Sequence, residues 1–196
     1  MKNIIFTLAI VLALFVTACT APPDDLDRVA IEDPRDSTET VAPSSDGLTK
    51  VSADLTLSSF EFEGYGPGKS HIGTFEDGEM YFLYDNEALV GFVGVINPIT
   101  VKSDSEGLDK HLKTEDFFNV ESFPKITATS TIIDIENGQI TGDLVFLGVT
   151  KELTFPATIT DSSVEAEVVF DSTLWGMNYN GVNPEVRVAF KFVAEP

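Results

Sequence analysis

Few residues in this chain have the types and spacing that catalysis or metal binding requires. The run Gly68–Ser70 resembles the end of a phosphate-binding loop, but the first glycine of that motif would fall on Glu63, and no helical pattern comes after it. The chain has two histidines, His71 and His111, and a metal site would need further ligands at helical or strand spacing. We therefore predict no metal and no other cofactor.

Acid–base and nucleophilic catalysis are also weakly supported. Glu115 and Asp116 form an acidic pair, which fits a solvated helix end better than general acid–base work. His111 shares a helical face with Leu108 and Leu112, which favours a structural, hydrogen-bonded histidine. Counting residues does not exclude a catalytic triad assembled in space, but nothing marks a nucleophile elbow. We predict that the protein is not an enzyme.

Cys19 is the one residue whose position predicts a covalent modification. Met1 and Lys2 precede an apolar run from Ile4 to Val16, which is typical of an export signal. The run ends in Val16–Cys19, a pattern that looks like a bacterial lipobox, in which the cysteine is acylated with chains such as palmitate. The alternative is an ordinary signal peptide that happens to contain a cysteine. We expect a signal peptide over residues 1–18 and lipid attachment at Cys19, the only cysteine of the chain.

Residues 19–48 differ in composition from the rest of the chain. This stretch is rich in Pro, Asp, Glu, Ser and Thr and poor in large apolar residues, so it predicts a disordered acidic tether. A short amphipathic helix over Leu26–Ile31 is the less favoured alternative. The remaining residues, 49–196, are enough for a single β domain. The net charge of −20 argues against nucleic acid and anionic headgroups as surface partners.

The domain shows the period-two alternation of antiparallel strands. The even positions of one strand are Val186, Val188, Phe190 and Phe192, while Arg187 and Lys191 take odd positions, and Val164–Phe170 and Ile140–Phe146 show a similar alternation. Earlier strands are expected over Lys50–Glu63, Thr74–Tyr84 and Ala88–Ile96, with a break at Asp77-Gly78. About eight strands with one helix predict a closed sheet or a sandwich, and periodicity alone does not choose between them.

The middle of the domain gives the most specific order of elements. A short helix is expected over Leu108–Phe118, followed by Pro124 and a strand from Lys125 to Ile135. Asn137-Gly138 predicts a two-residue type I′ hairpin turn before a strand over Gln139–Leu147. Gly148–Lys151 is then expected to turn into a strand over Glu152–Ile159.

This order resembles the YceI-like family. The matching segments are HLKTEDFFNVESFPKITATS, ITGDLVFLGVTKELTFPATI and FDSTLWGMNYNG, within roughly Lys50–Val193. The resemblance implies an antiparallel lipocalin-like β-barrel of about eight strands that binds a polyisoprenoid or another long-chain lipid. The family usually has an arginine where Ser172 or Thr173 stands, so an anion contact made by that arginine is in doubt here. The resemblance also raises a homodimer, although no exposed apolar strand argues for one.

A barrel of this size either fills with its own side chains or holds one small ligand. The residues alone leave the two alternatives equal, and the resemblance favours the cavity. If a cavity exists, we expect its wall to lack charge, which would require a mostly hydrocarbon ligand. The expected lining comprises Phe60, Phe62, Phe92, Phe146, Phe170, Phe190 and Phe192, with Trp175 and Tyr179 at the entrance. Lys69, Ser70 and His71 match a region of the family, and the resemblance makes them candidates for contact with a ligand headgroup; an ordinary polar turn is the alternative.

The sequence thus predicts a non-enzymatic lipid carrier. It would hold a polyisoprenoid or similar lipid and be tethered through Cys19 to the periplasmic side of a bacterial membrane. Thr20 after Cys19 favours the outer membrane, and the acidic tether also fits export to the cell surface. The alternatives are a structural or interaction module with a filled barrel and, less favoured, an enzyme acting on a lipid.

Overall fold

The computed structural model describes residues 20–32 and 47–196. The expected signal peptide, Cys19 and the second half of the expected tether, 33–46, lie outside the described residues. Within the two ranges the chain forms strands, one short α-helix and two 3-10 turns. No helix within these ranges has the length and apolarity needed to cross a membrane.

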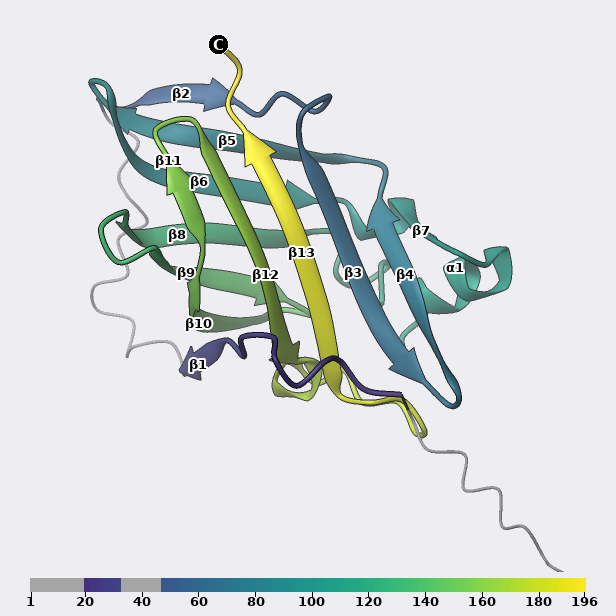
Figure 1. Ribbon diagram of the computed structural model, residues 1–196. Coiled ribbons are helices and arrows are strands. Elements are labelled where there is room, and N and C mark those ends of the chain that lie inside the picture. Colours follow the sequence, from purple (N-terminus) through teal and green to yellow (C-terminus); the bar gives the residue numbers. More distant parts are fainter. Residues whose placement is uncertain (1–19, 33–46) are drawn as a thin grey trace, which may run out of the picture.

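Two antiparallel sheets lie face to face, and their strands cross steeply in Figure 1. The order in the first sheet is β1 (Ala30–Glu32), β10 (Val149–Pro156), β9 (Gln139–Phe146), β8 (Ile126–Asp134), β6 (Ala88–Ile96), β5 (Gly78–Asp85) and β2 (Thr49–Ser52). The order in the second is β11 (Thr158–Thr160), β12 (Ser163–Asp171), β13 (Glu185–Val193), β3 (Ser59–Gly66), β4 (Lys69–Phe75) and β7 (Val101–Ser103). Helix α1 (Glu106–Leu112) comes after β7, and the 3-10 turns are η1 (Pro98–Thr100) and η2 (Ser172–Trp175).

The two sheets are joined at their edges by short links. Ala53, just after β2, forms a bridge with Ala194, just after β13, and the amide of Glu195 donates to the carbonyl of Ser52 over 2.8 Å. At the opposite edge, Arg28 bridges Val169 of β12 before the chain enters β1 and pairs with β10. The expected closed eight-stranded barrel is therefore replaced by two separate hydrogen-bonded sheets with local seams.

The N-terminal part of the expected tether is ordered. Residues Thr20–Glu32, which we call the N-terminal strap, run along the open edge between β10 and β12. The side chain of Val29 is 9% exposed and packs with Ala166 and Val168. Composition predicted disorder for this segment. Backbone hydrogen bonds to two sheet edges and a few buried apolar residues instead offset the entropy that is lost when the polar segment is ordered.

Several local predictions need correction. The helix is shorter than expected: it ends at Leu112, and Thr114 to Asn119 continue as turns held by backbone hydrogen bonds. The Asn137-Gly138 loop is not a type I′ turn, because only Gly138 has a positive φ, of 62°, and Asp134 pairs with Gln139 across four loop residues. Leu147 and Gly148 form the two-residue turn instead, with φ values of 49° and 74° and Phe146 paired with Val149.

The expected strand boundaries also shift at two places. The stretch Lys50–Glu63 divides into β2 and β3, whereas the expected break at Asp77-Gly78 is confirmed, since β4 ends at Phe75 and β5 begins at Gly78. The stretch Glu152–Ile159 divides between β10 and β11 next to Pro156. Proline lacks the amide that a ladder needs, so the chain leaves one sheet there and joins the other at Thr158. The strand Ala88–Ile96 has the predicted bounds.

Candidate functional site: an apolar cavity between the sheets

A cavity of about 800 Å³ lies between the two sheets. Its volume is within the range of about 300–1,000 Å³ that is common for small-molecule sites. The wall is made by the inward positions of strands from both sheets, among them Ile140, Leu144, Val186 and Val188. The alternation along each strand directs one set of side chains inward, so the same period that builds the sheets builds the wall.

Phenylalanine side chains dominate this wall. Seven predicted residues lie in it: Phe60, Phe62, Phe92, Phe146, Phe170, Phe190 and Phe192. They contact one another and other rings; the centroids of Phe190 and Phe192, for example, are 5.2 Å apart and stacked. Of the two entrance candidates, Tyr179 lines the cavity, 38% exposed. Whether these residues hold a ligand remains a prediction.

Trp175 lies behind the wall rather than in it. It is 2% exposed, packs against Phe146 and Phe170 at centroid distances of 6.4 and 5.4 Å, and donates from Nε1 to the carbonyl of Leu144 over 3.3 Å. Its ring therefore fixes two lining phenylalanines in place. The indole is a core residue that touches the site only through its neighbours.

The three headgroup candidates lie on β4 beside the cavity wall rather than in it. Lys69 is exposed at the start of β4, Ser70 is half-buried, and none of the three is among the described lining residues. His71 Nδ1 lies 2.6 Å from Asp104 Oδ1, and His71 pairs in the sheet with the lining residue Gly64. A role for them in holding a headgroup would need a contact outside the cavity.

Sequence reasoning missed a group of lining residues that come from turns and from the region after α1. Leu112, Phe117 and Phe118 extend the wall from α1 and its following turns, and Met177 and Asn178 extend it from the loop before β13. Phe118 packs edge-on against Phe62 at a centroid distance of 5.8 Å. The pair Phe117-Phe118 in a helix-like pattern indicated that both rings are buried. It did not indicate that they line the cavity.

A hydrogen-bonded carboxylate anchors α1 beside the cavity. Oδ1 of Asp109 accepts from the Ser103 amide over 2.6 Å and from the Ser103 hydroxyl over 2.7 Å. Lys102 Nζ lies 3.7 Å from Oδ2. The side-chain and backbone hydrogen bonds from Ser103 hold the pKa of Asp109 below its usual range. This staple joins α1 to β7 and so positions Leu112 and the rings that come after it.

The charged residues of β3, β12 and β13 lie on the face opposite the cavity. Arg187 contacts Glu167 at 2.6 Å and Glu61 at 3.0 Å. Burial opposes its charge, but the hydrogen bonds to Glu167 and Glu61 raise the pKa of Arg187 above its ordinary value. Tyr65 donates to Glu63 over 3.1 Å, and burial together with that bond raises the pKa of Tyr65 to about 12.

The two ends of the cavity differ in charge. Exposed lining residues at the start of β3 and the β4–β5 turn include Glu76, Asp77 and Glu79. These residues and the half-buried Asp143 of β9 correct the expectation of a wall without charge. Exposed lining residues at the other end are Thr173, Asn178, Tyr179 and Pro184. Within the described ranges, no three His, Cys, Asp or Glu residues are placed to hold a metal ion.

Two packed sheets around an apolar cavity define a small β protein of the ligand-binding class. The model of the YceI-like domain matches residues 49–194, so the chain belongs to this family. Protein YceI of Escherichia coli is 32% identical over 123 residues, which are 61% of this chain and 60% of that protein. The match thus spans less than two thirds of this curated relative.

Solved structures share the fold at low sequence identity. BcnA of Burkholderia cenocepacia superposes with a TM-score of 0.65 at 16% identity, covering 73% of this chain and 99% of that chain. A polyisoprenoid binding domain from Saccharophagus degradans, implicated in plant cell wall breakdown, superposes with a TM-score of 0.57 at 12% identity, covering 76% and 99%. These likenesses support the two-sheet architecture.

Proposed function

We propose that this protein is a non-enzymatic carrier that holds a polyisoprenoid or a similar long-chain lipid between its two sheets. The observation that carries the proposal is the cavity of about 800 Å³ with its wall of phenylalanine and aliphatic side chains. The same proposal places the acylated Cys19 in a bacterial membrane facing the periplasm, with the outer membrane favoured. The polyisoprenoid-binding neighbour from Saccharophagus degradans supports the class of ligand.

The physical basis is burial of hydrocarbon. Each methylene removed from water contributes about 0.8 kcal/mol before the cost of ordering the ligand. A chain with ten buried methylenes would therefore gain roughly 8 kcal/mol, which is enough for stable loading after moderate ordering costs. A structural module would be expected to fill its interior with its own side chains. The cavity therefore favours the carrier over that alternative.

The proposal is tested by identifying and exchanging the cargo. Protein purified gently from its native membrane is extracted with organic solvent, and the extract is analysed by mass spectrometry. Delipidated protein is then titrated with geranylgeraniol, and the emission of the single tryptophan, Trp175, is monitored. Because Trp175 contacts Phe146 and Phe170, loading is expected to change its emission until the cavity is saturated.

A co-purifying long-chain lipid and saturable uptake are the expected results. An extract without lipid, together with no uptake of geranylgeraniol, would instead favour the structural module. Cleavage or modification of the added lipid during the titration would contradict a non-enzymatic role.

A further inference from the structure

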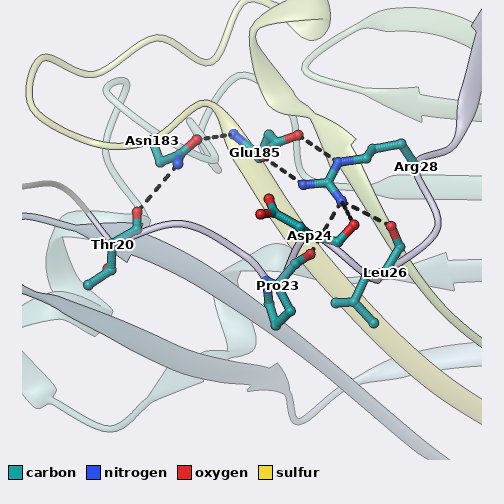
Figure 2. Close-up of polar contacts among 7 residues, drawn as sticks. All are labelled: Thr20, Pro23, Asp24, Leu26, Arg28, Asn183 and Glu185. Atoms are coloured by element: carbon teal, nitrogen blue, oxygen red, sulfur yellow. Dashed lines mark hydrogen bonds and ion pairs between the residues drawn. The ribbon is translucent and has the colours of Figure 1, made fainter.

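The N-terminal strap is docked on the domain from its first described residue. The amide and the hydroxyl of Thr20 both donate to the carbonyl of Gly66, each over 3.2 Å. Nδ2 of Asn183 donates to the carbonyl of Thr20 over 3.3 Å (Figure 2). Gly66 ends β3 and Asn183 lines the cavity, so Thr20 is held at one end of the cavity.

Further along, a buried valine and an arginine hold the strap in place. Arg28 pairs with Glu185 at 3.1 Å and also donates to the carbonyls of Pro23 and Leu26, which keeps the intervening turn closed (Figure 2). The amide of Val29 donates to Val169 over 2.9 Å. The strap is therefore held at Thr20 by the end of β3 and the loop before β13, and further along by β13 and β12.

This docking fixes the place where a membrane anchor joins the domain. Cys19 and Thr20 are joined by one peptide bond, which sets their Cα atoms about 3.8 Å apart. The opposite end of the cavity, at the start of β3, lies about 23 Å away along that strand. A carrier on a flexible tether could turn any face toward the bilayer. When Thr20 is held on the domain, no flexible residues separate it from the anchor at Cys19, so the domain can turn less freely.

The charges of the lining residues at the two ends agree with this orientation, while the strap itself carries the exposed Asp24, Asp25 and Asp27. The exposed lining residues near the anchor, Thr173, Asn178, Tyr179 and Pro184, are neutral. The far end carries the carboxylates of Glu76, Asp77 and Glu79, which anionic headgroups would repel.

We propose that the strap holds the cavity end formed by Met177–Pro184 against the bilayer, so that lipid passes between the membrane and the cavity while the protein stays anchored. The inference rests on the proposed function, because it requires an acylated Cys19 and a lipid cargo. The surface that faces the membrane is thus the loop before β13, and the β11–β12 turn at Asp161 and Ser162 lies at the far end.

The orientation is measured with two labels on the full acylated protein. Asn180→Cys places a fluorophore on the loop before β13, and Ser162→Cys places it on the exposed turn at the other end of β12; neither residue lines the cavity. Acylation blocks the thiol of Cys19, so each variant offers one reactive cysteine. The proteins are reconstituted in phosphatidylethanolamine–phosphatidylglycerol vesicles whose acyl chains carry a quencher. Strong quenching at position 180 and little at position 162 are expected.

A linker variant tests whether the strap sets this orientation. Inserting about 12 Gly and Ser residues between Cys19 and Thr20 adds a flexible span of roughly 20 Å while leaving every strap contact intact. The difference in quenching between the two labels is expected to vanish, and transfer of geranylgeraniol from the vesicles is expected to slow. The same linker added after Pro196 is the matched control and leaves both measurements unchanged.

The outcomes separate this inference from the proposed function. Equal quenching at both positions, or a difference that survives the linker, overturns the orientation even when geranylgeraniol uptake in detergent is normal. Unequal quenching that the linker abolishes supports the orientation even when uptake fails, in which case the carrier function is rejected. A purified N-terminus whose mass lacks acyl chains overturns both the anchor and the orientation.

Discussion

The amide of Val29 donates to the carbonyl of Val169 over 2.9 Å, and the amide of Val169 donates to the carbonyl of Asp27 over the same distance. The next residues of the chain, Ala30–Glu32, pair with β10 of the other sheet. The strap is thus hydrogen-bonded to both sheets within six residues. Because Val29 also lines the cavity, this pairing completes the wall at an edge where β10 and β12 do not pair.

Shortening the side chain of Val29 is expected to weaken this seam. Val29→Ala removes two buried methyl groups and should lower the free energy of unfolding by about 2 kcal/mol, with faster loss of bound lipid. Urea unfolding followed by circular dichroism measures the first effect. Ile132→Ala is the control, because Ile132 is 52% exposed and its removal should change stability by less than about 0.5 kcal/mol. Equal changes in the free energy of unfolding for the two substitutions would contradict a stabilising role of Val29 at the junction of the two sheets.

Filling the cavity from Gly64 is expected to weaken lipid binding by at least about tenfold without unfolding the protein. A Cβ built on Gly64 meets nothing within 4 Å, and this residue of β3 lines the cavity. Gly64→Phe should therefore enter the space that the lipid needs. Displacing only two methylenes, at about 0.8 kcal/mol each, would weaken binding about tenfold. Titration with geranylgeraniol measures the loss, and Ile132→Phe on the exposed face is the control. Unchanged affinity of the Gly64 variant would place the cargo elsewhere.

The charge of Asp109 is expected to make stability depend on pH in the acid range. Its pKa is lowered in the folded protein, so its contribution is present above the unfolded pKa and is lost as the pH falls through the folded pKa. Asp109→Asn keeps the shape but removes the charge, and it should lower the melting temperature at neutral pH. The gap to the parent should close as the pH falls below about 4, the usual carboxyl range. Thermal unfolding of both proteins across this pH range measures the difference in melting temperature. A difference that does not change with pH would contradict the role of the charge.

Tyr65 is expected to give the opposite dependence at alkaline pH. Its folded pKa is raised to about 12, so its stabilising contribution is complete below the unfolded pKa of about 10 and is lost as the pH rises toward 12. Tyr65→Phe should be less stable than the parent at neutral pH and should approach it between these two values. Urea unfolding at several alkaline pH values is the measurement. Parallel curves for the two proteins would show that the hydroxyl is not the titrating group.

Alternation along the strands was enough to predict much of the wall. In β13, Val186, Val188, Phe190 and Phe192 all line the cavity, because a strand with one charged face must turn its apolar face inward. The strand β6 contains no charged residue, and its predicted bounds are confirmed because the turn at Asp85-Asn86 marks where it begins. Local patterns succeed where the side-chain period and the burial pattern agree.

The strap and the division into two sheets could not be predicted in the same way. Ordering of Thr20–Glu32 depends on unpaired edges of β10 and β12, which exist only after the sheets have formed. Alternation of Val29 and Ile31 around Ala30 was the only local signal, and the surrounding Asp and Pro residues outweighed it. The position of Trp175 behind Phe146 and Phe170 likewise depends on packing between distant segments.

Exposed lining residues lie at both ends of β3, from Leu55 and Glu76 at one end to Asn178 and Tyr179 at the other. If the proposed lipid binds there, a cavity that is open at both ends limits the width of the lipid but not its length, since the excess chain can extend into solvent. Members of a homologous series that differ only in the number of repeating units would then share one carrier, whereas a bulky ring system of equal mass would be refused.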